Sequence, residues 1–300
     1  MKRILYHPVI NAALRTVARP FAPVIPEQFK FPVTGVIKVK VAAGKHIRVK
    51  CNPTSFVARK LFWHGMDGFE YTMARLFTRL VEDTEVFLDI GANIGYYSLL
   101  ASALKPQMKV ISFEPAPAVF AYLKDNQELN GFDHMKPEQL AMSDQDGHLE
   151  FFISKNPKYV GIADHHLTST GSFDKVQADR TSILESVKVQ TTTLDNYVQK
   201  QKLDKIDLIK LDTEATEHLV LAGAQHVLKN HRPVFFCEVL PGKVEQKIAE
   251  AFSAHNYLIY RLANTGIERV DLLSHDASIT NDHLMIPPEK QDYLESLLEN

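Results

Sequence analysis

Cysteine is scarce in this sequence, whose 300 residues contain two, Cys51 and Cys237. The two lie far apart, and Cys237 sits within the apolar run VFFCEV, a position typical of a buried, reduced thiol. A disulfide framework of the kind that stabilises small secreted domains is therefore excluded, although one bridge between the two thiols stays an alternative. This cysteine usage predicts a cytoplasmic protein.

Long apolar runs and a charge excess of either sign are also missing. No stretch approaches the run of about eighteen apolar residues that a transmembrane helix needs, so no membrane span is predicted. The 34 lysine and arginine residues nearly balance the 36 acidic residues, and the net charge is −2. Because proteins that bind nucleic-acid phosphates normally carry a basic excess, we expect no nucleic-acid partner.

The first 26 residues begin with basic side chains but make a poor signal peptide, because their apolar stretch is broken by His7, Pro8, Asn11 and Arg15. An amphipathic helix is expected from about residue 9 to residue 19. It would cap the body of the protein or lie on its surface. Weak peripheral contact with a membrane through this helix is the alternative.

Residues 33–52 alternate apolar and polar side chains, which predicts two short strands, and Gly44 is placed to turn them into a hairpin. Residues 68–80 carry apolar side chains at helical spacing. We assign residues 1–80 to an N-terminal accessory region of helix, short strands and helix. No clean linker separates it from the rest.

From residue 85 onward the pattern alternates between strands and helices. Strands are expected at 85–90, 109–114, 135–142, 148–154, 205–212, 233–239, 257–262 and 283–288. Such alternation implies right-handed crossovers and a largely parallel sheet covered on both faces. Residues 81–300 are therefore predicted to form a doubly wound, Rossmann-like α/β domain whose ligands bind at the carboxyl ends of the strands.

The polar stretch from residue 155 to residue 187 is too long for a simple connection. Loops of this length in compact domains are usually functional or disordered. We interpret it as a substrate loop or lid over the carboxyl edge of the sheet.

The segment VFLDIGANIGYYS, residues 86–98, carries the strongest chemical signal. A strand ends at Asp89, Gly91 and Gly95 bracket a tight turn into a helix, and Glu114 ends the next strand, where an acid can hold ribose hydroxyls. A carboxylate at Asp89 would repel a pyrophosphate, and the three-glycine dinucleotide pattern is absent. S-adenosylmethionine carries a sulfonium and an ammonium and no phosphate, so these residues favour it.

Several segments in order resemble the FkbM family of S-adenosylmethionine-dependent methyltransferases, over about residues 69–287. They are VFLDIGANIGYYSL, SFEPAPAVFAYLKDNQELN, AMSDQDGHLEFF, TTTLDNYV, IDLIKLDTEATEHLVLAGA and NDHLMIP. The resemblance implies a seven-stranded methyltransferase sheet and O-methylation, and it makes Asp144 a candidate to contact the adenine of the cofactor. An ordinary turn acid before Gly147 is the alternative for Asp144. The residues expected to bind the cofactor are therefore Asp89, Gly91, Asn93, Gly95, Glu114 and Asp144. Where the family usually has glycine, this chain has Ala215, which would be strained at positive φ.

Asp212 and Glu214 follow a strong buried strand, at the edge where the transferred methyl group is expected. O-methylation removes a proton from the acceptor hydroxyl, and a positioned carboxylate or histidine can take it. We predict Asp212 and Glu214 as the catalytic acids, with His165 and His166 in the polar stretch as alternative bases.

Other acids near this edge have simpler interpretations. Glu217 is expected to face solvent in the first helical turn, where the helix dipole favours an acid, and Asp195 is expected to cap the helix that follows it. Glu238 ends the next strand, with a role in acceptor binding and a purely structural role equally open. Oxygen ligands from Asp212, Glu214 and Glu238 would suit magnesium or calcium. Nothing in the pattern requires a metal, and none is predicted.

The sequence thus predicts an S-adenosylmethionine-dependent O-methyltransferase. The family resemblance alone suggests a hydroxyl of a sugar, glycan or small molecule as the acceptor. A nicotinamide-dependent oxidoreductase and a non-catalytic nucleotide-binding module are the rival functions. The oligomeric state is left open.

Overall fold

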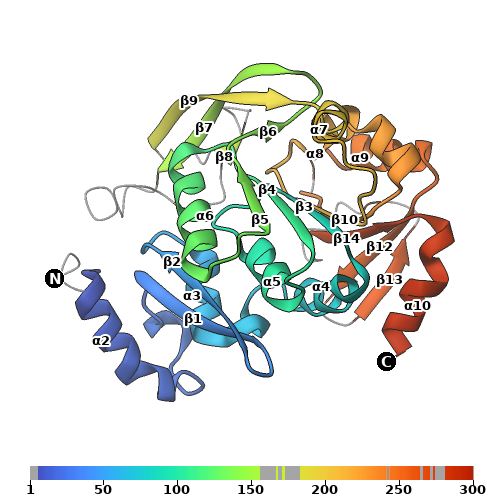
Figure 1. Ribbon diagram of the computed structural model, residues 1–300. Helices are drawn as coiled ribbons and strands as arrows, with labels where there is room; N and C mark the ends of the chain where they lie inside the picture. Colours follow the sequence, from blue (N-terminus) through green and yellow to red (C-terminus); the bar gives the residue numbers. More distant parts are fainter. Residues whose placement is uncertain are drawn as a thin grey trace.

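The computed structural model describes residues 6–155, 167, 171–172, 183–240, 242, 244–263, 266–270, 273 and 281–299. Figure 1 shows a central sheet flanked by helices, with the N-terminal helix and hairpin on one side of the molecule and the C-terminal helix on the other. None of the described helices is long and apolar enough to cross a bilayer.

Eight strands of the described residues form the central sheet, in the order β13-β12-β14-β11-β10-β3-β4-β5. Strands β5, β4, β3, β10 and β11 are parallel, whereas β14 lies antiparallel between β11 and β12. Their bounds are Val86–Ile90 (β3), Lys109–Phe113 (β4), Met135–Glu138 (β5), Leu208–Leu211 (β10), Val234–Glu238 (β11), Leu258–Ala263 (β12), Gly266–Val270 (β13) and Asp282–Ile286 (β14). The doubly wound α/β prediction is confirmed. The sheet has β13 in addition to the seven strands that the family resemblance implies, and the strand expected at 148–154 lies in a second sheet.

The central strands are short apolar runs because both of their faces are covered. Alternate side chains such as Phe87 and Phe236 enter one core, and Leu88 and Phe235 enter the other. The first core lies under α4 (Tyr71–Asp83), α5 (Tyr96–Leu104) and α6 (Pro117–Asn130); the second lies under α7 (Leu194–Gln201), α8 (Glu217–Ala222) and α9 (Glu245–Ala254). A π-helical turn follows α8 at Val227–His231, and α10 spans Gln291–Glu299.

The N-terminal region contains α2 (Pro8–Ala18), the hairpin of β1 (Gly35–Ala42) and β2 (Lys45–Cys51), and α3 (Phe56–His64). Gly44 has φ +73° at the predicted turn. The inner side chains of the hairpin, such as Ile47 and Val49, belong to the same core as Phe87 of the central sheet. The N-terminal region therefore shares a core with the Rossmann-like part, and the predicted boundary at residue 80 falls inside α4.

Helix α6 covers the outer edge of β2 in this two-stranded hairpin. On the β2 side, Asn130 of α6 accepts from the backbone N–H of Arg48 (2.8 Å) and donates to its carbonyl (2.7 Å). Asn126, fully buried, accepts from the N–H of Lys50 (2.6 Å) and donates to the carbonyl oxygens of Lys50 (3.3 Å) and Ile94 (2.9 Å). Unpaired strand edges invite pairing with other chains, so these side chains protect the hairpin and fasten it to α6.

A second sheet has the order β6-β9-β7-β8, with β6 at Ala141–Met142, β7 at Gly147–Lys155, β8 at Gly171–Ser172 and β9 at Ile183–Thr192. Strands β7 and β9 are antiparallel along their whole length. The polar stretch predicted at 155–187 is thus bordered by strands, and its last five residues belong to β9. Most of the stretch lies outside the described residues.

Candidate active site

A cavity of about 290 Å³ opens at the carboxyl ends of β3, β4, β10 and β11. This is the edge at which open α/β sheets bind ligands. Its volume is close to the lower end of the range for small-molecule sites, about 300 Å³. Among the described residues, its lining includes six carboxyl side chains and one ammonium: Glu70, Asp89, Glu114, Asp212, Glu214, Glu238 and Lys210.

Asp89 is the penultimate residue of β3 and lines this cavity, with 1% of its surface exposed. Its Oδ2 accepts from the backbone N–H of Ser98 (3.1 Å) and from the Ser98 hydroxyl (2.6 Å), at the start of α5. Its Oδ1 is buried and has no protein partner. Burial raises the pKa of Asp89, while the nearby Lys210 and Ser98 act in the opposite direction. One carboxylate oxygen is therefore left to meet a ligand.

The predicted glycines are required by geometry. Gly91 has φ +83°, and a Cβ placed on it would lie 1.8 Å from the carbonyl oxygen of Asp212. Gly95 has φ +92° at the start of α5, and its Cβ would lie 2.6 Å from Leu123. Asn93 also adopts positive φ, +51°. No larger residue at position 91 would allow the β3 turn to approach the end of β10 so closely.

Glu114 follows β4 and holds the same loop from the other side. Its two oxygens accept from the backbone N–H groups of Asn93 (3.0 Å) and Ala116 (2.9 Å). Burial raises the pKa of Glu114 to about 7, against the effect of these two donors. The acid predicted for ribose binding therefore lies in the cavity. It is hydrogen-bonded to the loop of residues 91–95 that follows β3, which we call the glycine loop.

Lys210 is a central group of the site that the sequence analysis missed. It is 5% exposed within β10, and its Nζ lies 2.7 Å from Oδ2 of Asp212. The charges of Asp212, Asp89 and Glu70 raise the pKa of Lys210, although burial alone would lower it. Its Nζ also lies 5.4 Å from the centre of the Tyr97 ring. The sequence signal that could have identified Lys210 is a lysine within the otherwise apolar strand LIKL.

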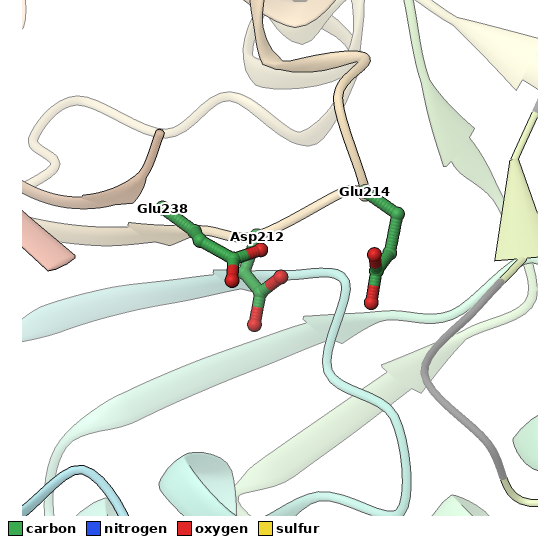
Figure 2. A group of neighbouring side chains, drawn as sticks. All are labelled: Asp212, Glu214 and Glu238. Carbon is green, nitrogen blue, oxygen red and sulfur yellow. The ribbon is translucent and has the colours of Figure 1, made fainter. Parts of the chain in front are cut away.

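Asp212, Glu214 and Glu238 lie together (Figure 2), with one carboxylate oxygen of each residue within 4.8 Å of the other two. Burial, then the negative charges of Asp212 and Glu214, raise the pKa of Glu238 to about 11. Glu238 therefore holds its proton at neutral pH. Such a group of oxygens can hold a hard divalent cation when all are ionised, but a protonated Glu238 is a poor ligand.

Glu70 is a second residue that the sequence analysis missed. It precedes α4 in the left-handed region, with φ +45°, and its Oε2 accepts from the Tyr97 hydroxyl (2.7 Å). Burial and the charge of Asp282 raise its pKa to about 8. The sequence offered only a weak signal, an acid at the start of a helix, and its contacts depend on tertiary packing.

The backbone after β10 is unusual at two consecutive positions. Glu214 has φ +57° and Ala215 has φ +71°. Ala215 is 2% exposed, so its methyl group is enclosed. The strain expected where the family usually has glycine is therefore present, since left-handed backbone is unfavourable for residues with a Cβ.

Some predicted site residues lie elsewhere. Asp144 is exposed after β6, accepts from the Ser143 hydroxyl (3.1 Å) and is not among the cavity-lining residues; its contact with the adenine stays a prediction. Neighbouring Leu140, Ala141 and Met142 do line the cavity. His165 and His166 lie outside the described residues.

Two predicted structural roles are wrong. Glu217 begins α8 but is fully buried rather than facing solvent, and it accepts from the backbone N–H (2.7 Å) and the hydroxyl (3.1 Å) of Thr213. Thr193, not Asp195, caps α7. Asp195 instead accepts from the backbone N–H groups of His226 (2.8 Å) and Val227 (3.0 Å), ahead of the π-helical turn. Both acids bind backbone that the local pattern did not reveal.

One described residue of the predicted lid reaches the cavity. Leu167 is buried and lines it, and its backbone N–H donates to the Thr54 hydroxyl (2.7 Å). Phe56 and Phe69 of the N-terminal region line the cavity as well. The N-terminal region and the polar stretch thus both contribute to the walls above the strand ends.

A parallel sheet with an inserted antiparallel strand, a glycine loop after β3 and an acid after β4 define the class of Rossmann-like methyltransferase domains. Comparison with known families agrees: the sequence model of the Methyltransferase FkbM domain matches residues 89–276. The chain belongs to this family, which confirms the resemblance stated from its motifs.

Individual relatives are distant. The chain is 28% identical over 156 residues to the 2-O-methyltransferase NoeI of Sinorhizobium fredii, covering 50% of this chain and 61% of NoeI. It is 25% identical over 161 residues to the hexuronic acid methyltransferase AglP of Haloferax volcanii, covering 54% of this chain and 59% of AglP. The chain thus spans about three-fifths of the length of these relatives.

Among solved structures, the chain is similar to a methyltransferase FkbM from Methylobacillus flagellatus. The identity is 14%, the TM-score is 0.44, and the match covers 68% of this chain and 44% of that one.

Proposed function

We propose that this protein transfers a methyl group from S-adenosylmethionine to a hydroxyl group of a sugar, glycan or small molecule. The observation that carries the proposal is the acidic lining of the cavity, whose described part holds six carboxyl side chains and a single buried ammonium. Burial raises the pKa of several of these acids, and a bound cation would favour their ionised forms. Such a site favours a ligand with a sulfonium and an ammonium, and it disfavours the pyrophosphate of a nicotinamide dinucleotide.

The residues of the glycine loop fit this cofactor. The buried and unpartnered Oδ1 of Asp89 is placed to meet a cation or a donor, and Glu114 is placed to accept from ribose hydroxyls. Leu140, Ala141 and Met142 offer an apolar wall for a flat base. When bound, S-adenosylmethionine supplies an electrophilic methyl carbon next to its sulfonium.

The chain's own residues would orient the acceptor and remove its proton. Asp212 and Glu214 lie at the cavity beside β10, and either carboxylate can accept a hydroxyl proton. The ammonium of Lys210, 2.7 Å from Asp212, holds that carboxylate in place. Alignment of the acceptor is expected to be the larger contribution.

The acceptor class rests on relatives. The names of NoeI and AglP describe methylation at a 2-O position and of a hexuronic acid. Phe56 and Phe69 give this cavity aromatic walls above the acids, which suits the apolar face of a sugar ring. A sugar or glycosylated hydroxyl is therefore our first choice of acceptor.

Calorimetric titration with S-adenosylhomocysteine, S-adenosylmethionine and NAD⁺ tests the cofactor. We expect binding of the first two and none of NAD⁺, with Glu114→Ala weakening both affinities about tenfold or more, since hydrogen bonds to charged groups contribute about 1.5–3 kcal/mol. Glu138→Ala is the matched control, because Glu138 ends the neighbouring strand β5 and is not among the cavity-lining residues. Binding of NAD⁺ alone would identify an oxidoreductase instead.

Transfer of a labelled methyl group to a panel of sugars and glycosylated small molecules tests the reaction. Binding of S-adenosylhomocysteine without transfer to any hydroxyl in the panel would favour the remaining rival, a non-catalytic module.

A further inference from the structure

The N-terminal helix α2 is oriented with its polar side toward the protein. Asn11 is fully buried, donates to the carbonyl oxygen of Pro32 (3.1 Å) and accepts from the backbone N–H of Thr34 (3.0 Å). Arg15 is 6% exposed and donates to the carbonyl oxygen of Val36 (3.3 Å). The two residues lie four apart, on one side of the helix.

The apolar side of α2 therefore faces outward. Val9 is 72% exposed and Val17 is 71% exposed, and the exposed row continues beyond the helix to Val24, at 76%. Eight of the ten exposed large apolar side chains among the described residues lie within residues 9–36: Val9, Ile10, Leu14, Val17, Phe21, Val24, Phe29 and Val36. Single exposed apolar residues are ordinary, but a contiguous row marks a surface that binds something.

A strongly basic face borders this row. The outer side chains of the hairpin are exposed, and the strand register sets Lys38 opposite Arg48 and Lys40 opposite His46. Like charges directly opposite on a sheet are destabilising, so this arrangement suits an external anion. Of these outer side chains only Lys50 has an acidic partner among the ion pairs of the described part of the chain, namely Asp125 at 2.6 Å.

The two surfaces are adjacent in space. Arg15 of α2 and Arg19, which directly follows the helix, donate to the carbonyl oxygens of Val36 (3.3 Å) and Lys38 (3.5 Å) along the outer edge of β1. Figure 1 shows α2 at the periphery of the molecule, beside β1. We call the exposed apolar row of residues 9–24 and the outer face of the β1–β2 hairpin together the N-terminal surface.

The net charge of the whole chain does not reveal how basic this surface is. The first 66 residues contain twelve lysine and arginine residues and one acid, Glu27, whereas the other 234 contain 22 basic and 35 acidic residues. The near-neutral total is the sum of a segment at +11 and a segment at −13. An approaching anionic surface would thus meet one side of the protein preferentially.

We propose that the N-terminal surface docks the protein on an anionic phospholipid membrane. Apolar side chains that enter the interface, next to basic side chains that pair with lipid phosphates, are the two features that bind a helix in the plane of a membrane. A nucleic acid would use the basic face but would leave the aliphatic row in water. The lipid surface is the occupant that uses both.

Co-sedimentation with vesicles tests this proposal on the full chain. We expect binding to vesicles of phosphatidylglycerol and phosphatidylcholine, weak binding to phosphatidylcholine alone, and steep weakening as salt rises. The triple substitution Lys38→Ser, Lys40→Ser and Arg48→Ser should weaken binding about a hundredfold, since each basic residue near the surface contributes about 1 kcal/mol. Lys200→Ser with Lys229→Ser, two exposed lysines elsewhere, is the control and should leave binding nearly unchanged.

The apolar row is tested separately. Val9→Ser with Val17→Ser should weaken vesicle binding about tenfold or more, while retained binding of S-adenosylhomocysteine or an unchanged Tm shows that the variant is folded. Absence of binding to anionic vesicles would overturn the proposal. So would tight binding of an RNA oligomer that the valine substitutions leave unchanged, or a concentration-dependent dimer that they abolish, since either would identify another occupant.

Discussion

The Nζ atom of Lys210 lies 2.7 Å from Oδ2 of Asp212, where β10 ends at the cavity. Asp89 and Glu70 lie near the same ammonium, and their charges, when they are ionised, raise the pKa of Lys210. Lys210 is therefore the one cation in the described lining of the cavity that offsets its carboxylates. Both the stability of the site and its readiness to accept a cationic ligand depend on this pair.

Lys210→Met removes the charge and keeps an apolar side chain of similar length. We expect the free energy of unfolding to fall by about 3 kcal/mol, because breaking a buried ion pair leaves the other charge uncompensated. Lys205→Met is the control, since Lys205 is 56% exposed and pairs with Asp207 at 2.9 Å; its loss should be below about 1 kcal/mol. If urea denaturation shows the same loss of unfolding free energy for both variants, the Lys210–Asp212 pair contributes no more than a surface ion pair.

Asp212→Asn and Glu214→Gln separate the two predicted bases. If Asp212 takes the acceptor proton, its substitution should lower kcat about 100-fold or more and leave S-adenosylhomocysteine affinity nearly unchanged. Glu214→Gln should then have the smaller effect. The double substitution His165→Ala and His166→Ala completes the comparison, and a larger loss there would transfer the role of base to the polar stretch.

The buried acids predict a stability that declines with pH. The pKa of Glu114 is raised to about 7 in the folded chain, against about 4.3 in an unfolded one. Its contribution is fully present below about pH 4 and is lost as the pH rises through 7, because the folded state binds the extra proton. Urea denaturation between pH 5 and 8, in the absence of cofactor, should show a smaller decline for Glu114→Gln than for the natural chain. If stability declines equally with pH in both proteins, the pKa of Glu114 is not raised in the folded state.

Ala215→Gly should stabilise the protein by about 1 kcal/mol, since glycine adopts the left-handed backbone without the penalty that a Cβ incurs. Ala222→Gly is the matched control, at the exposed end of α8 where φ is not positive; it should destabilise or have little effect. Thermal unfolding of the two variants measures both. If Ala215→Gly is instead less stable than the natural chain, the methyl group of Ala215 contributes packing energy that outweighs its backbone strain.

Chelation of divalent metals by EDTA should leave methyl transfer unchanged. Although the carboxylates of Asp212, Glu214 and Glu238 converge, the pKa of Glu238 is raised to about 11 and the ammonium of Lys210 already lies beside Asp212. The raised pKa disfavours the ionised form of Glu238, and the ammonium already balances the charge of Asp212, so we expect that no metal is needed. Loss of activity on chelation, restored by magnesium, would show that one is required.

The parts of the site that the sequence revealed are those with local causes. Asp89, Gly91 and Gly95 follow one another within seven residues, and their spacing alone encodes a strand, a tight turn and a helix. Ala215 could be interpreted as strained because the resemblance pointed to glycine at that position. The sequence signals are local, although the contacts that require the glycines come from Asp212 and Leu123, elsewhere in the chain.

The parts that it concealed depend on segments distant in the chain. Glu217 is the exception, with a local cause: it was expected to face solvent because the first turn of a helix is usually open, but the nearby turn at Thr213 folds back over it. Lys210 gains its role only when the ends of β3 and β10 and the start of α4 meet. The outward orientation of α2 is equally invisible in its pattern, since Asn11 finds its partners at Pro32 and Thr34.

A single buried amide joins the hairpin to the glycine loop. Asn126 binds the backbone of Lys50 in β2 and the carbonyl oxygen of Ile94 between Asn93 and Gly95. The hairpin is consequently not a module that could be grafted onto a relative alone, because a transplant would have to carry α6 and its asparagines with it. An insertion or deletion that moves the hairpin would have to be matched by a change in α6, because the hydrogen bonds of Asn126 connect the two.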